Sequence, residues 1–169
     1  RSFFEDGSGD LYAARKGDST LTPLVTSPAT EVEPVVSPDG RWLAYTSGES
    51  GTPEIYVRPF PDAGAARWQV STAGGSDPMW AHSGRELFYR SAQESMMSVA
   101  IGPGATFAFG QPKALFSTAN YLPSTPVQSY DVSPDDKRFL LLRATSSNDR
   151  NELIVVQHWT EEMKGRARR

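Results

Sequence analysis

The chain has 169 residues, 38% of them hydrophobic and 11% aromatic, which is enough for an ordinary domain with a core and unlike a disordered chain. It has no cysteine, which excludes disulfides, thiolate catalysis and Cys-based zinc sites. The net charge is −3, and up to Met163 the 13 basic and 20 acidic side chains give −7. An acidic body argues against nucleic acid as a partner, because a nucleic-acid surface needs a basic stripe.

The first predicted element is a hairpin at residues 3–14, with a tight turn at 6–10, and a further strand follows at 21–26. The 14 glycines and 13 prolines are spread along the chain as turn residues, which is typical of many short strands. No apolar run approaches the ~18 residues of a membrane span. The chain begins at Arg1 without Met or a signal peptide, so we expect a piece of a longer protein.

A nine-residue pattern then occurs three times. It combines a small residue, a turn and a basic residue with apolar positions two apart. The copies are SPDGRWLAY at 37–45, AHSGRELFY at 81–89 and SPDDKRFLL at 133–141. Their offsets of 44 and 52 residues are close to the ~40–45 residues of a four-stranded propeller blade, and the period of two predicts strands. Trp42 aligns with Glu86 and Arg138, which predicts an outer, more tolerant face for Trp42.

The resulting fold prediction is all-β: a partial β-propeller of four-stranded antiparallel blades, about three and a half in number, with a short C-terminal helix. The expected boundaries are a partial first blade at 1–26, blades at 33–72 and 77–118, a last blade at 127–159, and a helix with a basic tail at 160–169. A closed propeller typically needs about four to eight blades. We therefore expect one of three arrangements. The remaining blades lie upstream in a longer protein, two copies of the chain close one ring together, or the blades close incompletely.

The segment Glu33–Tyr45 resembles the TolB-type WD40-like propeller repeat, whose mark is a Ser-Pro-Asp-Gly turn after an inner strand. The second copy keeps an acidic residue and proline at Asp77-Pro78 and keeps Gly84, but it lacks the Pro-Asp pair of the turn. The third copy has Asp136 where glycine is usual. The resemblance covers most of the chain, and it is specific for the fold and nearly silent on function.

The ending Asn151–Glu162 is similar to the C-terminus of bacterial proteins that join a serine/threonine kinase domain, a membrane span and a TolB-like sensor propeller. That resemblance implies the sensor region of a kinase-like protein on the extracytoplasmic side, periplasmic or at the cell surface; the alternative is a cytoplasmic protein. A membrane would be contacted only through the parent protein. No kinase motif is present in this chain.

Motifs for chemistry are absent from the sequence. There is no Gly-x-Ser-x-Gly elbow, and neither His82 nor His158 has metal-ligand spacing, so both are expected to be structural or exposed. The loop Asp6–Asp10 alternates oxygen ligands as a calcium loop does, but it lacks the distal Glu and fits a hairpin turn better. We expect no enzymatic activity, no metal and no cofactor in this chain.

A binding site is predicted where the first strand of each blade lines the central channel. The predicted binding residues are Glu33, Asp77, Trp80, Tyr121, Ser129, Tyr130 and Asp131. If the side chains of Glu33 and Asp77 converge at the mouth of the channel, their negative charge favours a cation, an amine or a basic peptide as the ligand. The alternative is that each acid accepts a neighbouring backbone N–H or an arginine, and that the aromatic residues pack between blades.

The sequence is consistent with three functions. The first is a non-catalytic binding or sensor module that recognises a peptide, protein or small ligand at the channel face, within a larger signalling protein. The second is the auxiliary propeller of a prolyl-oligopeptidase-type hydrolase. The third is a structural module for self-association, including a homodimer that completes the propeller. The long connection 120–128 fits either a functional loop or a neutral insertion.

Overall fold

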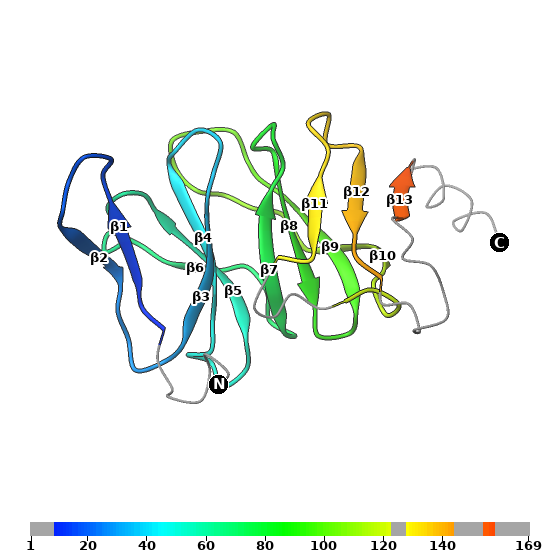
Figure 1. The fold of residues 1–169 in the computed structure, drawn as a ribbon, viewed down its shortest axis with the longest axis horizontal. Helices are drawn as coiled ribbons and strands as arrows, with labels where there is room; N and C mark the ends of the chain where they lie inside the picture. The colour runs from blue at the N-terminus through cyan, green and yellow to red at the C-terminus, as the bar shows by residue number, and fades with distance from the viewer. Residues whose placement is uncertain (1–8, 123–127, 144–153, 158–169) are drawn as a thin grey trace.

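The structure, a computed structural model, describes residues 9–122, 128–143 and 154–157, the last of these as backbone only. These residues form four antiparallel sheets that follow one another in chain order (Figure 1). They contain no helix, and none of them forms a helical segment with the length and apolarity that crossing a membrane requires. The predicted C-terminal helix and the first predicted strand lie outside the described residues.

The four sheets follow the order of the chain. The first sheet consists of β1 (Leu11–Ala14) and β2 (Leu21–Val25). The second consists of β3 (Glu31–Val36), β4 (Trp42–Ser47), β5 (Glu54–Pro59) and β6 (Trp68–Gln69). The third consists of β7 (Gly75–Trp80), β8 (Glu86–Ser91), β9 (Ser95–Ala100) and β10 (Lys113–Ser117). The fourth consists of β11 (Tyr130–Val132), β12 (Arg138–Leu141) and β13 (Ile154–Gln157).

Within each sheet the strands lie in sequence order, each antiparallel to the next, as in a propeller blade. Figure 1 shows the first sheet at one end of the molecule and the fourth at the other, so the described sheets form an open arc and do not close into a ring. The predicted all-β fold of four-stranded antiparallel sheets in a partial propeller is thereby confirmed.

The middle sheets are buried on both faces. Leu43 and Tyr45 of β4 pack toward the first sheet, whereas Trp42 and Ala44 of the same strand pack toward the third. All six residues of β4 are buried as a result. An aromatic cluster joins the second and third sheets, because the Trp42 ring lies 5.1 Å from the ring of Phe107. A blade with a neighbour on either side must therefore be apolar on both faces.

The prediction that Trp42 lies on an outer, tolerant face is wrong, since its exposed fraction is only 7%. The aligned positions Trp42, Glu86 and Arg138 do share one face, but that face points toward the next sheet along the chain. In the second sheet the next sheet covers it, and Trp42 is buried. In the fourth sheet Arg138 is exposed. Burial at this repeat position is set by the place of the blade in the arc, which alternation within one strand does not reveal.

The two ends of the arc carry exposed apolar side chains. Tyr12 of β1 is 51% exposed and Leu21 of β2 is 66% exposed. Leu140 of β12 and the following Leu142 are 37% and 48% exposed. The sheets at the ends of the described arc thus have one covered face and one face that still presents apolar surface to solvent.

The revised position of Trp42 predicts a large effect of truncation. Trp42→Ala removes a buried ring between two sheets and should lower the free energy of unfolding by about 3–5 kcal/mol. Tyr12→Ala, on the exposed face of the first sheet, should change it by about 0.5 kcal/mol or less. Urea denaturation followed by circular dichroism measures both. Similar small effects for the two variants would contradict the packing described.

Candidate functional site

The inner strands of the second and third sheets share a local distortion. Their pairing with the next strand shifts register across Glu33-Pro34 in β3 and across Asp77-Pro78 in β7, which are equivalent positions of the repeat. Glu33 and Asp77 have φ values of 58° and 59°, a left-handed conformation that non-glycine residues rarely adopt. The proline that follows each of these residues has no backbone N–H to donate to the neighbouring strand. The bulge therefore breaks no hydrogen bond of the sheet at the proline.

The distortion links neighbouring blades through hydrogen bonds. Glu33 Oε2 accepts the backbone N–H of Asp77 at 2.7 Å and the hydroxyl of Thr46 at 2.7 Å. The Tyr130 hydroxyl, on the inner strand of the fourth sheet, donates to the carbonyl of Asp77 at 2.6 Å. The inner strands of three successive sheets are therefore joined through the backbone N–H and C=O of Asp77. Glu33 accepts a neighbouring backbone N–H, which is the alternative to ligand binding that the sequence left open.

Arg90 of β8 binds two more of the predicted residues, Ser129 and Tyr121. Its guanidinium donates to Ser129 Oγ at 3.0 Å, to the Tyr121 carbonyl at 3.3 Å and to the Thr118 carbonyl at 3.4 Å. It also donates to the carbonyl of Leu122. Arg90 is buried, so these acceptors replace the water that its charge would otherwise need. The arginine fixes the chain on both sides of the connection into the fourth sheet.

The remaining predicted residues lie apart from each other. Trp80 is buried and donates its indole N–H to the carbonyl of Val35 at 3.2 Å. Asp131 is exposed on the opposite face of β11 from Tyr130 and accepts the N–H of Val132. The structure thus brings Glu33, Asp77 and Tyr130 into direct contact and leaves Asp131 outside. That the seven residues predicted from the sequence bind a ligand remains a prediction.

Two tyrosines near the inner strands have strongly raised pKa values. Burial raises the pKa of Tyr130 well above its usual range, and the carboxylates of Asp77 and Glu33 raise it further. Burial, followed by the charge of Glu54, raises the pKa of Tyr89 to about 12. The raised pKa keeps both hydroxyls protonated further into the alkaline range, and the protonated Tyr130 donates its hydrogen bond to the Asp77 carbonyl.

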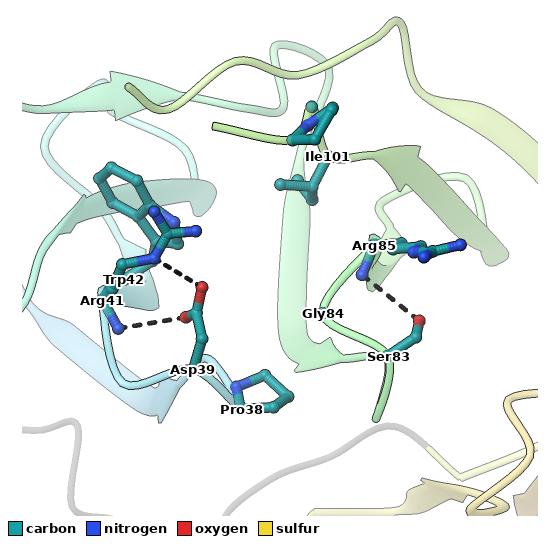
Figure 2. A pocket seen from close by; sticks show the side chains of 10 residues that line it. Pro38, Asp39, Arg41, Trp42, Ser83, Gly84, Arg85 and Ile101 are labelled. Carbon is teal, nitrogen blue, oxygen red and sulfur yellow. Dashed lines mark hydrogen bonds and ion pairs between the residues drawn. The ribbon is translucent and has the colours of Figure 1, made fainter. Parts of the chain in front are cut away.

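The structure also contains a cavity of about 680 Å³ that the sequence did not reveal (Figure 2). It lies between the turn after β3, the turn after β7 and the segment that follows β9. The lining residues are Pro38, Asp39, Arg41, Trp42, Ser83, Gly84, Arg85, Ile101, Gly102 and Pro103. Its size falls within the ~300–1,000 Å³ of typical ligand pockets. The only sequence signal for it is the basic residue that follows each turn, which also marks the fold.

Internal contacts fix one wall of the cavity. Asp39 accepts the Ser37 hydroxyl at 2.6 Å and the Arg41 Nε–H at 2.7 Å. The Ser37 hydrogen bond is the largest of the influences that hold the pKa of Asp39 below its usual value. Arg41 also donates to the Gly104 carbonyl at 2.7 Å, which ties the turn of the second sheet to the third. Trp42 and Ile101 add apolar surface, so the cavity combines charge with apolar walls.

His82 has a structural partner. Asp136 (φ 59°), which replaces the glycine usual in this turn, accepts the backbone N–H groups of His82 at 2.6 Å and Ser83 at 3.0 Å. It thereby joins the turns of the third and fourth sheets. His158 and most of the Asp6–Asp10 loop lie outside the described residues. Within the described part of the chain no three metal-binding side chains come together.

No family model matches the chain. Over 52 residues it is 35% identical to the Tol-Pal system protein TolB of Desulfosudis oleivorans, a stretch that covers 31% of this chain and 12% of that protein. A solved chain assigned as TolB from Agrobacterium tumefaciens is similar at a TM-score of 0.64 and 13% identity, over 92% of this chain and 55% of that one. A chain assigned as 6-phosphogluconolactonase from Bacteroides uniformis gives a TM-score of 0.52 at 13% identity, over 86% and 47%.

These likenesses show a TolB-type β-propeller fold, as the repeat predicted. At 13% identity they show the fold alone, so the enzyme name of one neighbour does not assign a reaction to this chain. The chain covers about half the length of these solved chains, and its match covers about an eighth of the curated relative.

The contact between Glu33 and Asp77 leads to a stability prediction. Glu33→Ala leaves the Asp77 N–H and the Thr46 hydroxyl without their acceptor and should lower the free energy of unfolding by about 1–3 kcal/mol. Glu33→Gln keeps an oxygen at this place and should cost less. Asp131→Ala, from the same predicted set but exposed, is the control. If Glu33→Ala proves as harmless as Asp131→Ala in urea denaturation, the link between the inner strands is wrong.

Proposed function

We propose that this chain is a non-catalytic binding module of a larger bacterial signalling protein, and that it recognises a peptide, protein segment or small ligand. The observation that carries the proposal is the cavity of about 680 Å³ between the turns Pro38–Arg41 and Ser83–Arg85. Loops on a rigid scaffold are common sites of recognition, and these turns are held by Asp39 and Asp136. The channel face predicted from the sequence is the second surface to be tested.

The parent protein is proposed to be serine/threonine kinase-like, with the propeller as its extracytoplasmic sensor region. The ending Asn151–Glu162 supports this proposal by its similarity to the C-termini of such proteins. A sensor of this type binds its ligand through loops and passes the event on by altered domain packing. Such a role needs a binding surface but no catalytic residues in this chain.

Selection from a displayed random-peptide library tests the binding function. Peptides enriched on the immobilised chain should lose binding to Ser83→Tyr, because Ser83 lines the cavity and a bulky ring there occupies part of it. Ser50→Tyr places the same ring on an exposed turn of the second sheet and is the matched control. Enrichment that neither variant disturbs, or no enrichment at all, would count against recognition at this cavity.

A second candidate function, self-association, is favoured by the exposed apolar faces at the two ends of the arc. Tyr12 and Leu21 at one end and Leu140 and Leu142 at the other would be covered if two copies completed one propeller. Light scattering over a concentration series should then show a dimer that Leu140→Glu dissociates. A monomer at every concentration would exclude this function for the chain alone.

A further inference from the structure

The two arginines at the cavity occupy the same position in two copies of the repeat, yet their surroundings differ. In the second sheet Asp39 lies two residues before Arg41 and forms an ion pair with it at 2.7 Å. In the third sheet Ser83 takes the place of that aspartate, two residues before Arg85. The fourth sheet has the acid again, as Asp135. The middle copy therefore has the arginine without the counter-ion.

Without a counter-ion, Arg85 leaves a positive charge at the rim of the cavity. Arg85 is exposed, and among the described residues its guanidinium has no hydrogen-bond or ion-pair partner. Figure 2 shows Arg85 on the wall opposite Asp39 and Arg41, with its guanidinium directed away from Asp39. The lining contains two arginines and one aspartate, which leaves one net positive charge on a protein whose net charge is −3.

Most backbone N–H groups of the two turns already donate within the protein, so the charge that can bind an anion here is that of the arginine side chains. Gly40 N–H donates to the Ser37 carbonyl at 2.8 Å and Gly84 N–H to the Ala81 carbonyl at 2.9 Å. The turns therefore offer no nest of backbone N–H groups, which is the usual cradle for a phosphate. A guanidinium presents a planar fork of donors that matches a carboxylate.

We infer that the cavity binds a peptide whose apolar side chains lie against Trp42 and Ile101, while a carboxylate of the same peptide pairs with the exposed Arg85 at the rim. The inference rests on the proposed function and names the ligand class for the same cavity. The carboxylate belongs either to an Asp or Glu side chain or to the end of the peptide. Arg41, which Asp39 already neutralises, contributes mainly to the shape of the wall.

The repeat supplies two substitutions with opposite expected effects. Ser83→Asp gives the middle copy the counter-ion that the second sheet has, so it should weaken binding about tenfold, as expected for loss of a charge-assisted contact. Asp39→Ser releases Arg41 and should strengthen binding. Arg85→Gln should weaken binding at least as much as Ser83→Asp. Arg15→Gln removes an exposed arginine from the turn between β1 and β2 and should change nothing.

The probes are N-acetyl-Leu-Leu-Glu amide, its Gln counterpart, and N-acetyl-Leu-Leu-Leu with a free carboxyl end, titrated into the labelled protein and followed by NMR. The Glu peptide should saturate shifts of the Gly84, Arg85 and Gly102 amides, and the Gln peptide should bind about tenfold more weakly. Comparison with the free-acid peptide shows which kind of carboxylate is preferred. Near-ultraviolet circular dichroism confirms that each variant is folded.

Equal binding of the Glu and Gln peptides, or a folded Ser83→Asp that binds as well as the parent chain, would overturn the inference. So would tighter binding of inorganic phosphate than of the Glu peptide. Peptides that occupy the cavity without any dependence on charge would overturn the inference and leave the proposed function standing. No saturable shift at the cavity with these probes overturns the inference, and the library selection then decides the proposed function separately.

Discussion

The packing of one sheet face against the next is the interaction on which this structure depends. Between the second and third sheets it is made by aromatic rings, with Trp42 5.7 Å from Trp68 and both within 5.1 Å of Phe107. Phe107 comes from the segment that joins β9 to β10, so the contact also fixes a connection of the third sheet against the second. The cavity follows from this, because its walls are the turns and the connecting segment that the aromatic contact holds near each other.

A second layer of contacts, which is polar and closer to the inner strands, also joins neighbouring sheets. Glu33 and Asp77 adopt left-handed backbone conformations that cost energy in isolation, and the hydrogen bonds of Glu33 and Tyr130 to the Asp77 peptide offset that cost. Asp136 does the same at the turns, where it accepts two backbone N–H groups of the neighbouring sheet. Each polar link thus joins one repeat to the next, rather than stabilising a repeat internally.

The sequence was enough to predict the strands, because the turn residues and the period of two are properties of each repeat by itself. The alternation of Leu43 with Tyr45, and of Phe139 with Leu141, correctly grouped the residues that face the preceding sheet. It failed for Trp42, whose burial depends on a neighbouring sheet and not on its own strand. The cavity was missed for the same reason, since Arg41 and Arg85 line one cavity only through the packing of two repeats that are 44 residues apart.

The contact between sheets is tested most directly by a double-mutant cycle at Trp42 of the second sheet and Phe107 of the connection between β9 and β10 in the third. Trp42→Leu, Phe107→Leu and the double variant are compared by urea denaturation. If the rings pack against each other as described, the two substitutions should couple by about 1 kcal/mol, because the aromatic contact is lost only once. Additive effects, with a coupling near zero, would contradict face-to-face packing of the second and third sheets and with it the cavity that this packing creates.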